Sequence, residues 1–302
     1  MAVSEALFES VAYELMKLSA IEVPKPVSDK LRECYAKETN PIAKKQFEAI
    51  FENCKVAHER QVCVCQDNGL HEIFIDFGLD CKIDGDLEAA AKRALAVATK
   101  KIPLRENAIH PLSKKNPGTN VEINIPTMHW RPLVGADYIE VTVVPKGNGS
   151  EMRDNHNWVL TSEDIGRATV RTVLDAVTDM MGEPCPPLII GVGLGGHFES
   201  NAMLAKRALF RDPIGAPSPD PMAAALEKEI LAAVNALGLG PMGFGGDTYA
   251  MACHIELSGA HTAIVPITVA VECWCHRYST ARIYNDGRVE YLTHPEANAV
   301  TA

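Results

Sequence analysis

The hydrophobic period of this chain changes near residue 60, and this change limits the folds that the chain can adopt. Before it, apolar residues recur at helical spacing, so that Leu7, Val11 and Leu15 share one face. A second helix is predicted after Ser28. A third begins at the Asn-Pro pair of residues 40 and 41, a cap followed by the proline favoured at the first helical position. The chain is therefore expected to begin with three helices.

Alternating apolar residues appear further along, first at Ile73, Ile75 and Phe77, and this is the pattern of a half-buried strand. Helices are predicted over residues 86–101, 161–181, 199–210 and 221–238, and strands over 121–125, 138–144, 188–192, 251–257 and 264–271, before a hairpin at 285–287. Two long stretches, 103–120 and 145–158, show no period, and such loops in compact domains are usually functional or disordered.

These patterns predict the α+β class, with small mixed or antiparallel sheets flanked by helices. We expect a single mixed domain over residues 1–302. It would consist of a helical segment over about 1–60, a core over about 61–280, and a hairpin and tail over 281–302. The order of the strands does not follow from the pattern.

Charge and composition exclude several classes of protein. The 39 acidic and 29 basic residues give a net charge of −10, which argues against binding to a nucleic-acid backbone. No run of about 18 apolar residues occurs, and the acidic N-terminal stretch is unlike a signal or transit peptide. We therefore expect a cytoplasmic protein that binds no membrane. Nine cysteines without a secretory address predict free thiols rather than a disulfide framework.

A glycine-rich stretch, Gly191 to Gly196, follows an apolar strand and precedes a helix, as a dinucleotide-binding fingerprint does. The context is incomplete, because the next acidic residue at a comparable distance, Asp212, lies in a proline-rich turn rather than at a strand end. Close backbone approach or anion binding at a helix N-terminus explains the glycines better. A dinucleotide-dependent oxidoreductase is therefore a distant alternative.

The cysteines form two Cys-x-Cys pairs, Cys63 with Cys65 and Cys273 with Cys275, and on a strand both members of a pair share one face. The spacing of a structural zinc knuckle is absent, although a non-catalytic zinc-binding or scaffold protein stays an alternative. Any single cysteine is more often a small buried hydrophobe than a ligand. Cys185 stands between prolines, which suits either a rigidly displayed ligand or a tight turn.

Cationic residues collect in the two irregular stretches: Arg105, His110, Lys114, Lys115, Lys146 and Arg153. Solvated charge is the ordinary explanation for such residues. A local positive region for a small anion is the functional one, because arginine binds carboxylates through two hydrogen bonds. His261 precedes an apolar strand that ends at Cys273, and a histidine in that place is more often structural than a ligand.

Five stretches together resemble one family: CQDNG (65–69), LRENAIHP (104–111), PKGNGSE (145–151), PCPPLIIGVGLGG (184–196) and HTAIVPITVAVECWCHR (261–277). In this order they are similar to motifs of the α-type domain of class I fumarate hydratases and L-tartrate dehydratases. The resemblance covers about residues 60–280.

The resemblance implies a [4Fe-4S] cluster on three cysteines, with one iron left without a protein ligand. By motif the ligands would be Cys65, Cys185 and Cys273, whereas Cys63 and Cys275 have no assigned role. An open iron position acts as a Lewis acid toward a substrate carboxylate and hydroxyl.

The same resemblance assigns substrate-binding and catalytic residues. Gln66, Arg105, Lys146 and Gly149 would bind substrate, while Asp67 and His261 would be catalytic. A carboxylate beside the cluster, here that of Asp67, suits proton transfer with the substrate hydroxyl or with water.

No base for the carbon-bound proton and no second-domain motif is evident, so we expect an α subunit that needs a β subunit, in an α2β2 assembly. The reaction expected is reversible hydration of fumarate to L-malate, with L-tartrate dehydratase and mesaconate hydratase as alternatives. Lys146-Gly147 and Gly149 to Glu151 look more like fumarases, whereas residues 273–277 look more like tartrate dehydratases. Asn68 and Asn148 depart from the usual family residues.

Overall fold

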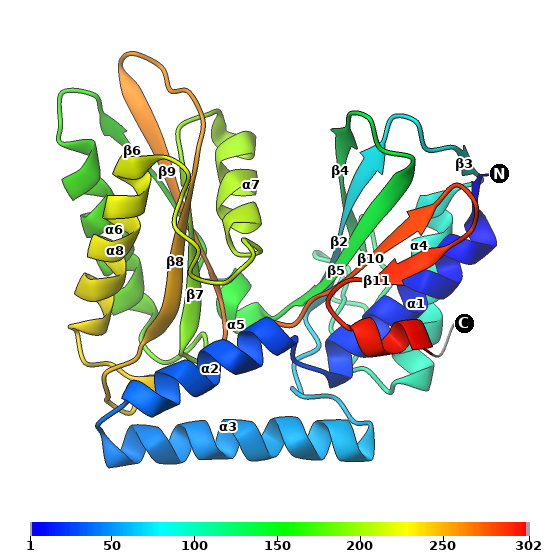
Figure 1. The fold of residues 1–302 in the computed structure, drawn as a ribbon, viewed down its shortest axis with the longest axis horizontal. Helices are drawn as coiled ribbons and strands as arrows, with labels where there is room; N and C mark the ends of the chain where they lie inside the picture. The colour runs from blue at the N-terminus through cyan, green and yellow to red at the C-terminus, as the bar shows by residue number, and fades with distance from the viewer. Residues whose placement is uncertain (1, 300–302) are drawn as a thin grey trace. The chain divides into compact units, whose positions relative to one another are not determined.

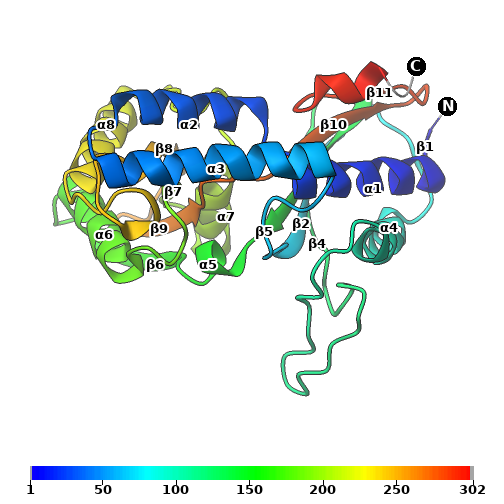
Figure 2. The same cartoon turned by 90° about the horizontal axis from the view of Figure 1, so that it is seen from below.

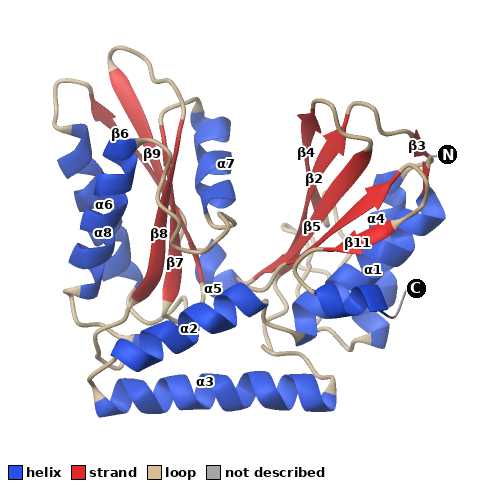
Figure 3. Cartoon of the chain, viewed as in Figure 1, coloured by secondary structure: helices blue, strands red, loops and turns tan. Residues whose placement is uncertain are grey.

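The structure of the chain is a computed structural model that describes residues 2–299. The residues group into two compact units: unit 1 contains residues 1–25, 52–148 and 277–302, and unit 2 contains residues 26–51 and 149–276. Each unit combines a mixed sheet with helices, as the colouring of Figure 3 shows, so the α+β prediction is confirmed. The assignment of residues 1–302 to one hydro-lyase domain stays a prediction.

Unit 1 is built on a five-stranded sheet in the order β11-β10-β5-β2-β4. The strands are β2 (Leu70–Gly78), β4 (Thr127–Leu133), β5 (Tyr138–Lys146), β10 (Ser279–Tyr284) and β11 (Val289–Tyr291). Within this sheet β2 and β4 pair in parallel, and the other neighbouring strands are antiparallel. A second, two-stranded sheet joins β1 (Val3–Ser4) to β3 (Ile83–Asp84), and the 3-10 helix η2 (Pro295–Ala299) follows β11.

Helices α1 (Glu5–Ile21) and α4 (Leu87–Lys101) cover one face of this sheet (Figure 1). The buried face of α4 consists largely of alanines, including Ala90, Ala94 and Ala98, and these small side chains allow α1 to pack closely against it. Ile73 and Ile75 of β2 point into the same core and are fully buried. The predicted helix with Leu7, Val11 and Leu15 on one face, the helix over 86–101 and the strand at Ile73 are confirmed.

Unit 2 contains a four-stranded sheet in the order β6-β9-β7-β8. The strands are β6 (Asn155–Leu160), β7 (Leu188–Leu194), β8 (Ala250–Leu257) and β9 (Ile264–Glu272). Helices α6 (Ile165–Met180) and α8 (Pro221–Asn235) lie on one face of the sheet and α7 (Phe198–Ala208) on the other (Figure 1). The short helices are α5 (Asn148–Glu151) and η1 (Pro241–Gly243). Helix α2 (Lys25–Lys37) begins one residue before the first segment of unit 2, which contains residues 26–51. Helix α3 (Pro41–Arg60) begins in this segment and continues beyond residue 51 into unit 1.

The glycines of the Gly191 to Gly196 stretch are explained by the packing of α7 on β7. A Cβ atom on Gly191 would lie 2.2 Å from the carbonyl oxygen of Ala205, and one on Gly193 would lie 2.3 Å from that of Asn201. Only glycine therefore allows the helix backbone to come this close to the strand. The structure supports the close-approach explanation of this motif.

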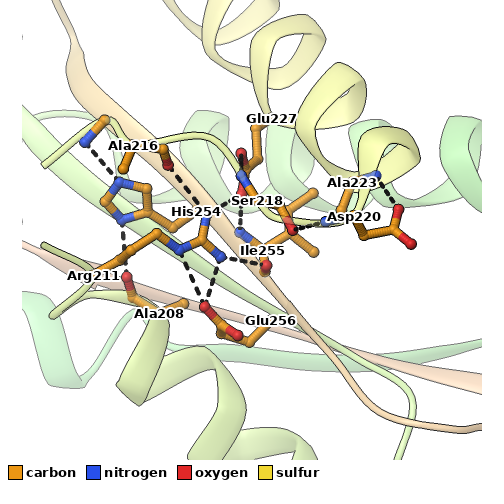
Figure 4. A network of polar contacts seen from close by, with 11 residues as sticks. Ala208, Arg211, Ala216, Ser218, Asp220, Ala223, Glu227, His254, Ile255 and Glu256 are labelled. Carbon is orange, nitrogen blue, oxygen red and sulfur yellow. Dashed lines mark hydrogen bonds and ion pairs between the residues drawn. The ribbon is translucent and has the colours of Figure 1, made fainter. Parts of the chain in front are cut away.

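A partly buried ionic network in unit 2 holds the loop between α7 and α8 against β8 (Figure 4). Arg211 donates to Glu227 Oε1 at 2.5 Å and to Glu256 Oε1 at 2.6 Å. His254, fully buried on β8, accepts a bond from the Gly215 amide at Nε2 (2.8 Å), while its Nδ1 lies 2.9 Å from the carbonyl oxygen of Ala208. Because one ring nitrogen accepts and the other must donate, this histidine fits only as the neutral imidazole.

The strand predicted over residues 121–125 is wrong. The structure has only an isolated bridge between Glu122 and Ile125 there, and the strand of this region, β4, begins at Thr127. Asn124 has a left-handed φ of +55°, which turns the chain, and Pro126 has no N–H group to donate to a ladder. A short segment of alternating apolar and polar residues thus forms a turn here.

Two helix starts also differ from the prediction. Helix α2 begins at Lys25 rather than after Ser28, because Pro26 occupies the first turn, where its missing N–H group costs nothing. Helix α6 begins after Asp164, whose side chain accepts from the Arg167 amide, and not at Thr161. The stretch 145–158, expected to be irregular, includes α5 and most of β6, an edge strand whose polar sequence hid it.

None of the helices in the described part of the chain is long and apolar enough to cross a membrane. Helices beginning at residues 41 and 221 and the terminal hairpin between β10 and β11 agree with the prediction. Asn40 and Asp220 cap the two helices by accepting backbone amide bonds.

Acid should destabilise unit 2 through His254. Burial lowers the pKa of His254 from 6.5 to about 4, with the nearby Arg211 acting in the same direction. The unfolded chain therefore binds this proton first, and stability present above pH 6.5 is lost as the pH falls toward 4, by on the order of 3 kcal/mol. Urea unfolding at pH 7.5 and pH 4 should show a smaller acid-dependent loss for His254→Gln than for the unsubstituted chain. Equal losses would contradict the assignment.

Candidate active site

The loop after α3 carries Cys65, Gln66 and Asp67, and the carboxylate of Asp67 holds this loop in place. Oδ1 of Asp67 accepts from the Gly69 amide at 2.9 Å and from Asn107 Nδ2 at 3.0 Å, and Oδ2 accepts from the Asn148 amide at 2.8 Å. Both oxygens are therefore fixed by N–H donors. All of these residues belong to unit 1.

The backbone of Asp67 is fixed as well. Its carbonyl oxygen accepts from Nη2 of Arg277 at 2.7 Å. Asn148 and Arg277 are residues of unit 1 at points where the chain passes between the two units. One residue of the Cys65 loop is therefore bonded to the chain at both of these points.

Arg105 lies beside this loop because two asparagines hold its backbone. Its amide donates to Asn68 Oδ1 at 2.6 Å, and its carbonyl oxygen accepts from Asn120 Nδ2 at 3.0 Å. Asn68 also donates to the carbonyl oxygen of Cys65 at 3.2 Å. Arg105 is exposed, and its guanidinium group makes no hydrogen bond or ion pair with the rest of the described chain.

Lys146, the last residue of β5, is buried and lies against Gly69. Gly69 has a left-handed φ of +65°, and a Cβ atom there would lie 2.2 Å from the Lys146 carbonyl oxygen. Gln66 is exposed on the same loop. Unit 1 thus brings together five of the predicted site residues: Cys65, Gln66, Asp67, Arg105 and Lys146.

His71, which sequence reasoning did not single out, lies on β2 next to this loop. It is almost fully buried, and neither ring nitrogen has a hydrogen-bond partner among residues 2–299. Burial, with a smaller contribution from the charge of Arg277, lowers the pKa of His71 to about 4, so the ring is neutral near pH 7. Asn107 and Asn120 were also missed, since a lone asparagine in a loop has no sequence signature.

Unit 2 places Cys185 and Cys273 on neighbouring segments. The Trp274 amide donates to the carbonyl oxygen of Cys185 at 3.1 Å, which ties the loop before β7 to the residues after β9. Cys185 is exposed and has a left-handed φ of +56°, an uncommon conformation for a residue other than glycine. The flanking prolines, Pro184 and Pro186, limit the alternatives open to this backbone.

The other members of the Cys-x-Cys pairs differ in their surroundings. Cys63 packs against the core of unit 1 and its thiol lies 3.7 Å from the carbonyl oxygen of Ile102. Cys275 is almost fully buried, and its sulfur lies 3.3 Å from that of Cys273, which is half-buried. Cys273 is therefore the more accessible member of its pair, whereas Cys63 and Cys65 are both half-buried.

His261 lies far from the cysteines of unit 2. It is exposed in the loop between β8 and β9, and its Nδ1 accepts from the Ala263 amide at 3.1 Å. Cys273 follows the other end of β9, which is about 27 Å away at the rise of an extended strand. Gly149 lies in α5, with the Glu183 carbonyl oxygen 2.9 Å from where its Cβ atom would be.

No unit contains all three predicted cluster ligands, because Cys65 belongs to unit 1 while Cys185 and Cys273 belong to unit 2. Within the described residues there is no group of three or more His, Cys, Asp or Glu side chains that could hold a metal ion. The roles of the nine predicted site residues stay predictions.

Comparison with known proteins identifies the family. The fumarate hydratase (Fumerase) family matches residues 9–282 of this chain. A protein of Methanocaldococcus jannaschii, provisionally named L(+)-tartrate dehydratase subunit alpha, is 37% identical over 286 residues, which cover 92% of this chain and 98% of that protein. The L(+)-tartrate dehydratase subunit alpha of Escherichia coli strain UTI89 is 32% identical over 272 residues, covering 90% of this chain and 89% of that protein. The chain therefore belongs to the fumarate hydratase family, as its five motifs indicated.

Replacing Gly69 by alanine should displace the Cys65 loop. Gly135, in the turn before β5, is a matched control, because its φ of +76° is also left-handed but a Cβ atom there would meet nothing within 4 Å. Gly135→Ala should cost about 1–2 kcal/mol from the backbone conformation alone. Gly69→Ala should cost roughly 2 kcal/mol more, because the methyl group overlaps the Lys146 carbonyl oxygen. Urea unfolding measures both values, and equal losses would show that the close approach does not matter.

Proposed function

We propose that this chain is the α subunit of an iron-sulfur hydro-lyase, which adds water to a small unsaturated dicarboxylate or removes it from the hydroxy acid. The observation that carries the proposal is the hydrogen-bonded frame that fixes Asp67 and Arg105 beside Cys65. Arg105 can bind a carboxylate, and Asp67 can exchange a proton. The same set of hydrogen bonds holds both residues in place. Membership of the fumarate hydratase family supports the same reaction class.

The thiols fit a [4Fe-4S] cluster by their chemistry and accessibility. Cys65 and Cys273 are half-buried and Cys185 is exposed, so each sulfur can reach a group at the protein surface. When bound by three thiolates, such a cluster supplies a Lewis-acidic iron without a protein ligand. The buried Cys275 and the core-packed Cys63 are poorer ligands.

Asp67 is suited to hold or move a proton at one defined place. An ionised carboxylate has about four acceptor positions, and three of those of Asp67 are taken by N–H donors. Two of these donors bind Oδ1 and one binds Oδ2, which leaves one position on Oδ2 for a water molecule or a substrate hydroxyl. Since the carboxylate cannot rotate without losing these bonds, its free position has a fixed direction.

Two substrates are supported by different observations. The relatives above carry the name L(+)-tartrate dehydratase, and residues 273–277 look like that branch. Lys146-Gly147 and Gly149 to Glu151 look like fumarases, which favours hydration of fumarate to L-malate. Mesaconate differs from fumarate by one methyl group and is a third candidate.

We propose further that a β subunit completes the enzyme, because the relatives are named as alpha subunits. It would supply the base for the carbon-bound proton. An α2β2 assembly in the cytoplasm is the arrangement we expect.

The cluster is tested by counting iron and sulfide after anaerobic reconstitution. The unsubstituted chain should hold about four of each. Cys65→Ser, Cys185→Ser and Cys273→Ser should each lose at least half of this content or become labile. Cys63→Ser and Cys275→Ser are the matched controls and should keep it. Full retention in the first three variants, or none in the unsubstituted chain, would refute the ligand set.

The reaction and the partner are tested by anaerobic assays with L-tartrate, fumarate and mesaconate. We expect turnover of one of them, at least tenfold above the others in kcat/KM, by the chain in complex with its β subunit. The chain alone should show less than a hundredth of this activity. Full turnover by the chain alone would disprove the need for a partner, and no turnover of any dicarboxylate by the complex would disprove the reaction class.

A further inference from the structure

We propose that Asn107, held by Asn120, is a positioning residue that orients the Asp67 carboxylate for catalysis. The inference rests on the proposed function of this site and adds two residues to which neither the motifs nor the relatives assign a role. The loop that contains them leaves α4 and extends away from it before returning to β4 (Figure 2).

Among residues 2–299, only Asn107 donates to the Asp67 carboxylate through its side chain, because the other two donors are backbone amides. Its Nδ2 donates to Asp67 Oδ1 at 3.0 Å and to the Gly69 carbonyl oxygen at 3.3 Å. The amide of Asn107 thus joins the carboxylate and the turn that follows it. Removing it would leave Oδ1 with one donor and release a rotation about the Cβ–Cγ bond of Asp67.

Asn120 in turn fixes Asn107. Its Oδ1 accepts from the amides of Asn107 at 2.7 Å and Ala108 at 3.2 Å. Its Nδ2 donates to the Arg105 carbonyl oxygen at 3.0 Å and to Thr99 Oγ1 at 3.2 Å. All four hydrogen-bonding positions of this side chain are used, and the residue is 2% exposed.

Thr99 lies in the last turn of α4, so the contacts form a continuous path from a regular helix to the carboxylate. The path runs from Thr99 through Asn120 to the backbone of Asn107, and through the Asn107 amide to Asp67. Asn120 also donates to the Arg105 carbonyl oxygen. The positions of Arg105 and Asp67 therefore both depend on Asn120. A path that connects a rigid element to both the cation and the carboxylate is what fixed geometry at a reacting centre requires.

The experiment compares Asn107→Ala, Asn107→Asp and the control Asn116→Ala in the α chain bound to its β subunit. Asn116 lies in the same loop, but its side chain bonds only to the backbone at Glu106 and Gly118. We expect Asn107→Ala to lower kcat about 10- to 100-fold with KM changed less than threefold. Asn116→Ala should stay within twofold of the unsubstituted enzyme.

Asn107→Asp separates positioning from packing, because aspartate has the shape of asparagine but replaces the donor by an acceptor. Positioning predicts a kcat no higher than that of Asn107→Ala. Simple packing predicts that the isosteric aspartate keeps more activity than alanine, and this result would overturn the proposal. An unchanged kcat in Asn107→Ala would overturn it as well.

Amide hydrogen exchange provides a readout that does not depend on the reaction. The Gly69 and Asn148 amides both donate to Asp67, so their exchange reports whether the carboxylate is held. Asn107→Ala should speed their exchange at least tenfold in the full chain, whereas Asn116→Ala should not. If the unsubstituted complex turns over no dicarboxylate, the proposed function is wrong, and amide exchange alone tests the role of Asn107. Faster exchange in Asn107→Ala then supports the positioning role, and unchanged exchange overturns it.

Discussion

The Asp67 carboxylate is the acceptor on which the loop after α3 depends. Residues 62–69 form no helix or ladder, so several of their backbone groups bond to side chains. Ordering such a residue costs roughly 1–2 kcal/mol, and a hydrogen bond to a charged group returns about 1.5–3 kcal/mol. Three N–H groups donate to this carboxylate, and Arg277 donates to the carbonyl oxygen of the same residue. The group proposed to move a proton is therefore also the group that orders its own loop.

In unit 2, the register of β7 and β9 determines where Cys185 and Cys273 lie. These strands are antiparallel, and Ile189 pairs with Glu272. Cys185 precedes the start of β7 and Cys273 follows the end of β9, so the pairing places both cysteines at the same end of the sheet. The bond between Trp274 and the Cys185 carbonyl oxygen extends this pairing beyond the strands. His261, at the opposite end of β9, is kept away by the same antiparallel arrangement.

Periodic features could be predicted from the sequence, and contacts between loops could not. The stripe at Leu7 and the alternation at Ile73 reflect burial on one face, which repeats along an element and leaves a pattern. The three asparagines that hold Arg105 and Asp67 act through hydrogen bonds within and between loops, and such bonds leave no periodic pattern in the sequence. The family resemblance located Cys65 and Asp67 but assigned no role to Asn107, although Asn107 stands in the motif over 104–111. Alternating apolar residues also gave a wrong prediction at residues 121–125, where the left-handed Asn124 turns the chain.

The net charge of −10 raises the question of how an acidic chain would attract a dianionic substrate. Several arginines of the described chain are bound to carboxylates: Arg153 binds Glu183 and Asp179, and Arg211 binds Glu227 and Glu256. A cation paired in this way exerts little field on a further anion. Arg105 differs, because only its backbone is engaged in the described chain, and asparagine amides hold it without adding negative charge. Neutral side chains around a fixed backbone thus leave the charge of the Arg105 guanidinium group unpaired and able to bind a substrate carboxylate.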